Sequence, residues 1–282
     1  MIKKQILMPT NKEINNIIKY LIPNVDIYFF CDLPSYIKDK IIPISVFKQT
    51  DYYSDIHYQT FYEYWIILKK IKYVWIDDEN EFCSLDKKEQ KDILKQQILL
   101  QRGTIIQNSK FKDLEYAIDN NYVLTNNTWN LLSKTMKKEC IIWLINDQED
   151  NTTSQISYSF SPEFAMIGNK YLTKSGCNCL SLVLYCITKD EKYLSTHIDD
   201  IKFLSKINDY KEITSLDFKP KDIVLFYQDS DLKHASFRLD DKYFLNKNGQ
   251  SVFNPITLQT FEDLKEDWNS CNKIIIRRKI TK

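Results

Sequence analysis

A cysteine, a histidine and an asparagine stand in this order in the second half of the chain, with residue types suited to acyl-group chemistry. Cys179 opens an apolar helical pattern, His234 lies near the start of an alternating strand pattern, and Asn246 follows twelve residues later. A thiol becomes a nucleophile when a base takes its proton, and an imidazole becomes a useful base when a partner fixes its tautomer. The chain has seven cysteines but only three histidines, so this order is its most informative feature.

Cys179 is expected in the first turn of a helix. Gly176 and Asn178 are turn and N-cap residue types. Apolar residues then recur at helical spacing: Leu182, Val183 and Cys186. The unpaired N–H groups of a helix start favour a thiolate and can hold a developing oxyanion. The alternative is that Cys179 is a small buried side chain. Cys177 precedes the cap and lacks the N–H cluster, so Cys179 is the preferred nucleophile.

His234 belongs to a predicted strand, 233–239, in which apolar and polar residues alternate, so its side chain points away from the apolar core. The alternative to a catalytic base is a solvent-facing histidine. The hairpin turn leaves two registers open. With a three-residue loop at 239–241, His234 lies opposite Asn246; with a two-residue loop it faces Lys247, a cation that would lower its pKa. The other two histidines, His57 and His197, are expected at the surface and receive no role.

Length and composition indicate an ordinary folded chain without a nucleic-acid partner. The 282 residues allow two domains, and 43% apolar with 27% charged residues is typical of globular proteins. Residues 1–150 carry 20 basic against 21 acidic side chains, and residues 151–282 carry 19 against 17. Neither half has the basic excess that binding to a phosphate backbone requires.

The cysteines and the N-terminus predict a reduced, cytoplasmic compartment. The chain starts without the apolar h-region of a signal peptide, and no stretch approaches the length of a membrane span. Seven cysteines without a regular spacing are interpreted as free thiols. The Cys-x-Cys pair at 177 and 179 has no second ligand pair at zinc spacing, so no metal site is expected.

The pattern along the chain predicts two domains, 1–150 and 151–282, joined by a polar linker at 146–157. The second domain is predicted as α+β, with the helix at 179 packed on one face of an antiparallel sheet; the first is predicted as mixed α/β with no recognised role. Asp86 and Glu89 form a predicted capping box for the best helix of the first half. The expected helices are 13–21, 62–69, 86–101, 127–138, 179–188 and 260–268; the expected strands are 26–31, 72–76, 140–145, 222–227, 233–239, 242–247 and 273–277, with a polar, helical insertion at about 190–212.

Residues 171–250 resemble the NlpC-type family of papain-like cysteine peptidases, best known as bacterial cell-wall endopeptidases. That family shows Gly-x-Asp-Cys-Ser-Gly-Leu-Val at the nucleophile, and residues 176–183 read Gly-Cys-Asn-Cys-Leu-Ser-Leu-Val. Its Pro-Gly-Asp-Leu-Val-Phe-Phe strand resembles Pro-Lys-Asp-Ile-Val-Leu-Phe at 220–226, and its histidine strand resembles residues 234–240. Asn178, Leu180, Ser181 and Lys221 are departures from the family pattern.

The resemblance implies a cysteine hydrolase, an amidase or peptidase that cleaves a peptide, amide or isopeptide bond through a thioester, with no metal or organic cofactor. Cys179 would be the nucleophile, His234 the base and Asn246 the residue that orients the ring, which favours the three-residue loop. Family members often add an upstream tyrosine to the oxyanion hole; Tyr171 is the candidate here, with a core tyrosine as the alternative, and Asn178 is a second candidate for oxyanion or substrate binding. An acyltransferase using the same site, and a non-catalytic binding protein on a degenerate papain-like fold, are the competing functions.

Overall fold

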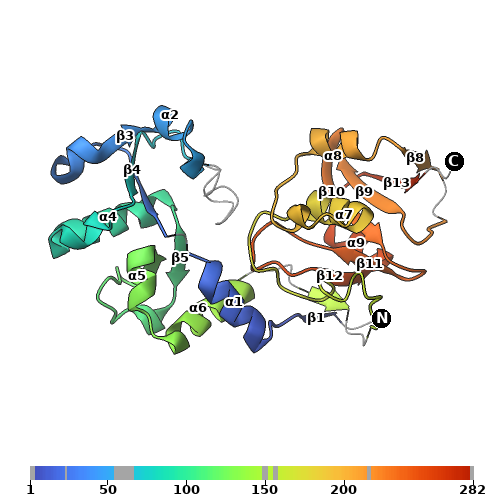
Figure 1. Ribbon diagram of the computed structural model, residues 1–282, viewed down its shortest axis with the longest axis horizontal. Coiled ribbons are helices and arrows are strands. Elements are labelled where there is room, and N and C mark those ends of the chain that lie inside the picture. Colours follow the sequence, from blue (N-terminus) through green and yellow to red (C-terminus); the bar gives the residue numbers. More distant parts are fainter. Residues whose placement is uncertain are drawn as a thin grey trace. The chain divides into compact units, whose positions relative to one another are not determined.

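The structure is a computed structural model that describes residues 4–22, 24–53, 67–147, 152–154, 158–214 and 217–279 (Figure 1). The chain forms two compact units. One contains the N-terminal segment up to Ile17 and the segment from Ile145 onward, and the other runs from Ile18 to Leu144. The boundary near residue 145 lies close to the expected one at 150, but the N-terminal segment was expected in the first domain and instead belongs to the C-terminal unit.

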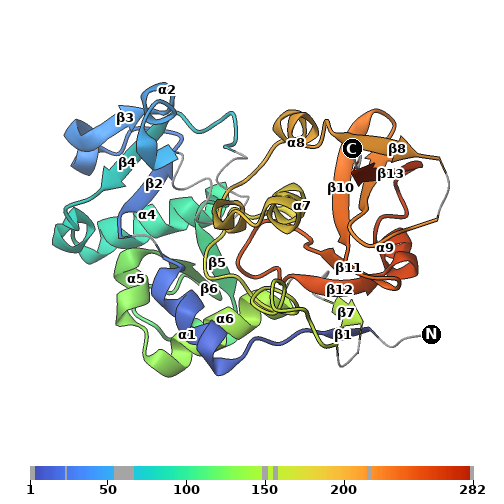
Figure 2. The ribbon, with the colours of Figure 1, turned by 45° about the vertical axis from the view of Figure 1, so that its right-hand side comes forward.

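Contacts distant in sequence hold that N-terminal segment in the C-terminal unit. Strand β1 (Lys4–Ile6) pairs antiparallel with β7 (Thr152–Ser154), as Figure 2 shows. The hydroxyl of Tyr171 donates to the carbonyl of Leu7 at 2.5 Å, and the Tyr171 N–H donates to Glu13 Oε1 at 3.0 Å. Such pairings leave no local signal in the sequence. Strand β7 also occupies part of the predicted linker, whose other positions lie partly outside the described residues.

The unit from Ile18 to Leu144 combines helices with two small sheets. Strands β2, β4 and β3 form one sheet in that order, β5 and β6 form another, and each of these pairings is antiparallel. This unit is therefore α+β rather than the expected α/β. Its elements are α1 (Asn11–Tyr20, which begins in the other unit), β2 (Asp26–Phe30), β3 (Ile41–Pro43), α2 (Ile44–Phe47), β4 (Tyr73–Asp77), α4 (Lys87–Leu100), β5 (Thr104–Gln107), β6 (Asn121–Leu124), α5 (Asn126–Leu131) and α6 (Lys134–Asn146, which ends in the other unit), with short 3₁₀ turns at Ser35–Lys40, Glu81–Ser84 and Ser109–Phe111.

In this unit, the sequence pattern that included a helix cap gave a correct prediction, and a short apolar run gave a wrong one. The capping box of Asp86 and Glu89 is confirmed at the start of α4. The predicted strand 140–145 is wrong, because these residues lie within helix α6. A six-residue apolar run has no periodicity that separates a buried strand from a buried helix segment. Most of the predicted helix 62–69, and His57, lie outside the described residues.

The C-terminal unit is built on one six-stranded sheet. The strand order is β12-β11-β10-β9-β13-β8, with every neighbouring pair antiparallel. The predicted helices at 179 and 260 and the predicted strands at 222, 233, 242 and 273 are confirmed, while β8 and β12 were missed. The elements are α7 (Cys179–Thr188), a 3₁₀ turn at Glu191–Leu194, α8 (Asp200–Lys206), β8 (Tyr210–Ile213), β9 (Ile223–Gln228), β10 (Asp231–Arg238), β11 (Tyr243–Asn246), β12 (Thr257–Thr260), α9 (Phe261–Asp267) and β13 (Lys273–Lys279).

Both faces of this sheet are covered, by α7 on one side and α9 on the other (Figure 2). Ala235 and Phe237 of β10 pack in the core beneath α7. Phe226 and Phe244 of the neighbouring strands pack with Leu264 of α9 on the opposite face. The sequence predicted a helix on one face only. The polar face of β10 is therefore an interior surface, and His234 on that face is 1% exposed.

Candidate active site

Asn178 is the N-cap of helix α7, as its residue type predicted. Its Oδ1 accepts hydrogen bonds from the Ser181 N–H at 2.9 Å and the Ser181 hydroxyl at 2.7 Å. Its Nδ2 donates to the carbonyl of Ile198 at 2.8 Å. Both polar atoms of the amide thus fix the start of the helix. This geometry gives Asn178 a capping role and does not support its predicted role in oxyanion or substrate binding.

Cys179 occupies the first turn of α7 and keeps partial solvent exposure, whereas Cys177 is buried. Its thiol accepts a hydrogen bond from the backbone N–H of Ala235, the peptide group that directly follows His234, and is also favoured as an anion by the N–H groups of Leu180 and of Cys179 itself. Burial outweighs these donors and raises the pKa of the Cys179 thiol to about 11. The resting nucleophile is therefore a neutral thiol that needs a base.

His234 is held by the side chain of Asn246. The Nε2 of His234 lies 2.5 Å from Asn246 Oδ1 and 3.2 Å from the hydroxyl of Ser236, which itself donates to the same Oδ1 at 3.0 Å. Because an amide oxygen only accepts, Nε2 carries the proton of the neutral ring. The other nitrogen, Nδ1, makes no hydrogen bond to the described residues and has a free lone pair. This is the tautomer in which Nδ1 could act as a general base.

A chain of side-chain amides sets the orientation of Asn246. Its Nδ2 donates to Gln259 Oε1 at 2.6 Å and to Asn248 Oδ1 at 3.0 Å. The Nε2 of Gln259 donates in turn to Asp267 Oδ2 at 2.6 Å. With its N–H groups engaged there, Asn246 presents its oxygen to His234. Gln259 lies on β12, which was not predicted, and Asp267 ends α9, which was; no sequence pattern linked either residue to the site.

Trp268, directly after α9, covers the imidazole. Its ring stacks on His234 with the ring centroids 4.2 Å apart and an angle of 12° between the planes. The ring of Phe226 lies 6.0 Å away. This burial lowers the pKa of His234 to about 3, while the bond to Asn246 opposes the shift. His234 is therefore neutral at physiological pH, rather than the solvent-facing residue that strand alternation allowed.

The β10–β11 hairpin takes neither of the predicted registers. Phe237 pairs with Leu245, and the N–H of Leu239 donates to the carbonyl of Tyr243 at 2.9 Å, so the three-residue loop is 240–242. Asp240 sets this turn by accepting from two backbone N–H groups at 2.8 Å, those of Lys242 and Tyr243.

This register places Ser236 across from Asn246 and makes His234 its diagonal neighbour. The loop has the expected length but begins one residue later, at Asp240. The observed pairing differs from the expected one by two residues, so Asn246 still lies on the same face of the sheet as His234. Side chains in diagonal positions on one face are close enough to interact.

Lys247 was the alternative neighbour of His234, and the structure places it elsewhere. It is 1% exposed, and its Nζ donates to the carbonyls of Ser251 at 3.0 Å and Asn254 at 2.7 Å. Burial lowers the pKa of Lys247 to about 8, opposed by the thiols of Cys177 and Cys179. The amide thus lies beside the imidazole, and the cation lies on the side of the thiols.

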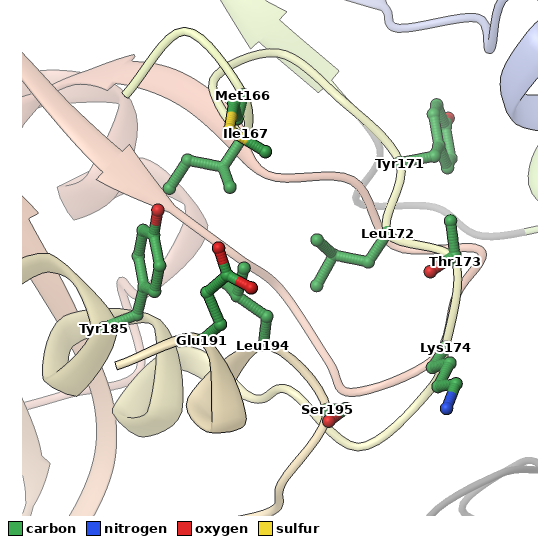
Figure 3. A pocket seen from close by; sticks show the side chains of 10 residues that line it. All are labelled: Met166, Ile167, Tyr171, Leu172, Thr173, Lys174, Tyr185, Glu191, Leu194 and Ser195. Carbon is green, nitrogen blue, oxygen red and sulfur yellow. The ribbon is translucent and has the colours of Figure 1, made fainter. Parts of the chain in front are cut away.

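Tyr171 lies outside the constellation. Its hydroxyl donates to the carbonyl of Leu7, and burial raises the pKa of that hydroxyl. Tyr171 is one of the residues that line a cavity of about 330 Å³, together with Leu172, Tyr185 and Glu191. Figure 3 shows the Tyr171 ring turned away from this cavity. The geometry corresponds to the core-tyrosine alternative rather than to an oxyanion donor. The other residues that line the cavity are Met166, Ile167, Thr173, Lys174, Leu194 and Ser195.

His197 is half-buried rather than fully exposed. Its side chain hydrogen-bonds the side chain of Gln250, and burial lowers its pKa. Gln250 also accepts from the N–H of Gly176 through its backbone carbonyl at 2.9 Å. His197 therefore supports the loop that flanks the start of α7, a role that no sequence pattern indicated.

Within the described ranges, no three His, Cys, Asp or Glu side chains gather as they would to hold a metal ion, and no helix is long and apolar enough to cross a membrane. Comparisons with protein-family models, with curated proteins and with solved structures found no match. The assignment of a function therefore depends on the geometry of the site.

Proposed function

We propose that this protein is a cysteine hydrolase that cleaves an amide or isopeptide bond, with Cys179 as nucleophile, His234 as general base and Asn246 as the residue that orients the base. The observation that carries the proposal is the hydrogen bond between His234 Nε2 and Asn246 Oδ1, which leaves Nδ1 as the basic nitrogen. The thiol of Cys179 accepts from the N–H of Ala235, so the proposed nucleophile lies against the β10 residue that directly follows the proposed base.

The proposed reaction starts from a neutral thiol and a neutral imidazole. His234 Nδ1 takes the thiol proton as Cys179 Sγ attacks the carbonyl carbon, and backbone N–H groups at the start of α7 stabilise the oxyanion. The imidazolium returns this proton to the leaving amine, and a thioester remains on Cys179. A water molecule, deprotonated by His234, then attacks the thioester and releases the acid.

Two departures from the NlpC-type motifs keep the backbone geometry that those motifs imply, and this supports a papain-like fold for the C-terminal unit. Lys221, where the family has glycine, takes a left-handed φ of 76°. Asn178, where the family has aspartate, caps α7, and both residue types are good N-caps. The ordered site also favours an enzyme over a degenerate binding protein. No observation favours acyl transfer over hydrolysis.

The proposal is tested with p-nitrophenyl acetate as a general acyl donor, followed by a panel of peptide anilides. The expected result is a burst of p-nitrophenolate, an acetyl group mapped to Cys179 by mass spectrometry, and release of aniline from at least one peptide. Cys179→Ala should abolish all three, and Cys177→Ala should abolish none. Modification of the exposed Cys83 without any adduct on Cys179 would refute the proposal. If added amines accept the acyl group from Cys179 faster than water does, the result would indicate an acyltransferase.

A further inference from the structure

A buried lysine lies on the thiol side of the sheet, and the mechanism above does not use it. Lys247 directly follows β11. Because successive side chains of a strand point to opposite faces, Asn246 turns toward His234 and Lys247 toward the side of α7. A fully buried lysine is rare in proteins unless it is paired, so its retention needs an explanation.

The loop 247–254 folds around the ammonium group and joins it to the segment that precedes α7. Two of the three N–H groups of Lys247 donate to the carbonyls of Ser251 and Asn254. The same loop is bound to the start of the nucleophile helix, because the Gly176 N–H donates to Gln250 O at 2.9 Å and the Val252 N–H donates to the hydroxyl of Ser175 at 3.1 Å. The ammonium is thus held in place against residues 175–179.

The groups that interact electrostatically with this ammonium are thiols. Its charge lowers the pKa of both Cys177 and Cys179, against the larger effect of burial, and on Cys179 it adds to the stronger effect of the backbone N–H groups. No carboxylate in the described part of the chain forms an ion pair with Lys247. Cys177 is 0% exposed, whereas Cys179 keeps contact with solvent. Cys179 is therefore the thiol that both interacts with this cation and is accessible to a substrate.

We propose that Lys247, in its protonated form, supplies the positive charge that stabilises the Cys179 thiolate while His234 removes its proton. The inference rests on the proposed function in taking Cys179 as the nucleophile. Two groups on opposite sides of the sheet then share the activation: a neutral imidazole accepts the proton, and a buried ammonium lowers the free energy of the anion that remains. The charge acts on the thiolate and the tetrahedral intermediate through space, without a proton transfer of its own.

The test is the pH dependence of Cys179 alkylation by iodoacetamide, followed by peptide mapping. Lys247→Gln keeps two N–H donors for the carbonyls and removes the charge, so the alkylation rate at pH 7, where a pKa of about 8 leaves Lys247 mostly protonated, should fall severalfold. Lys247→Arg keeps the charge and should stay near wild type, and Lys242→Gln, an exposed lysine in the hairpin turn, serves as the matched control. An unchanged rate profile for a folded Lys247→Gln variant would overturn the inference.

A second pair of variants keeps the test decisive if Lys247→Gln does not fold. Cys179→Asp places a permanent carboxylate where the thiolate forms, and Cys179→Asn is its neutral counterpart. NMR titration of labelled lysine should show the Lys247 amine titrating about one pH unit higher with Asp than with Asn. Equal titrations would refute the inference. Neither readout needs turnover, so a charge effect without acyl-enzyme formation would contradict the proposed function and leave this inference standing.

Discussion

His234 and Asn246 share a 2.5 Å hydrogen bond although they do not face each other directly across the β10–β11 hairpin. Ser236 occupies the opposite position and donates to the same amide oxygen. The bond is diagonal, and it forms because both side chains lie on the sheet face that α9 covers. It fixes Nε2 as the protonated nitrogen and leaves Nδ1 unprotonated.

Removal of the orienting amide should impair catalysis more than removal of the neighbouring hydroxyl. Asn246→Ala frees the imidazole to rotate and to change tautomer, so kcat/KM should fall by roughly a hundredfold, with the loss mainly in kcat. Ser236→Ala removes one donor but keeps the amide, and its loss should be several times smaller. The ¹⁵N NMR signals of His234 report the tautomer directly. A hundredfold loss in both variants would contradict the special role of the amide.

Removal of the Trp268 ring, which stacks on His234, should make the activity more sensitive to acid. Trp268→Ala admits water to the imidazole, so the pKa of His234 rises from about 3 toward its ordinary value, and the acidic limb of the kcat/KM profile moves to higher pH. Trp268→Phe keeps a stacked ring and should show a smaller shift. The cost in stability for the Ala variant is about 2–4 kcal/mol. An acidic limb at the same pH in both variants would argue against His234 as the base.

The buried His234 should destabilise the C-terminal unit in acid. Its pKa is depressed in the folded state, so the unfolded chain binds the extra proton below about pH 6.5, and the contribution of the neutral ring is lost as the pH falls toward 3. At pH 5 the loss is about 2 kcal/mol. Hydrogen exchange of the β10 amides should follow this slope, and His234→Gln should flatten it.

The other unit should respond to pH in the opposite direction. Burial, together with the charge of Asp77, raises the pKa of Asp26 to about 6, so the folded state holds a proton that the unfolded state releases near pH 4. This contribution is present below pH 4 and is lost as the pH rises through 6, by up to about 3 kcal/mol. Protection of the β2 and β4 amides should fall over that range, and Asp26→Asn should remove the slope. If the protection of these amides rises with pH instead, another titrating group dominates the pH dependence of stability in this unit.

The folded protein should be more stable with glycine than with lysine at position 221, which has a left-handed backbone just before β9. Lys221 has a φ of 76°, a conformation that strains any residue with a Cβ. Lys221→Gly relieves that strain and should raise the free energy of unfolding by about 0.5–1 kcal/mol, after allowance for the greater entropy of glycine in the unfolded chain. Lys219→Gly, two residues earlier and outside the left-handed region, should lower it. Urea denaturation compares the two, and a loss in both would contradict the prediction.

The sequence alone located the parts of the site that depend on local chemistry. Asn178 and the apolar spacing after it predicted helix α7 and the position of Cys179, because a cap and a periodicity act within one turn of helix. The same holds for the capping box of α4. Strand alternation correctly placed His234 on the polar face of β10. The apolar run at 140–145 carried no such signal, and its prediction as a strand was wrong.

Tertiary structure decided what each of these residues contacts. Trp268 and α9 turn the polar face of β10 into an interior, which gives His234 its low pKa, and Asn246 fixes its tautomer. The hairpin register depends on Asp240 and not on the loop length alone. Lys247 reaches the thiols because the loop 247–254 bonds to the segment before α7. These relationships join residues distant in sequence, and burial, which sets the pKa values, exists only once the sheet and both helices have assembled.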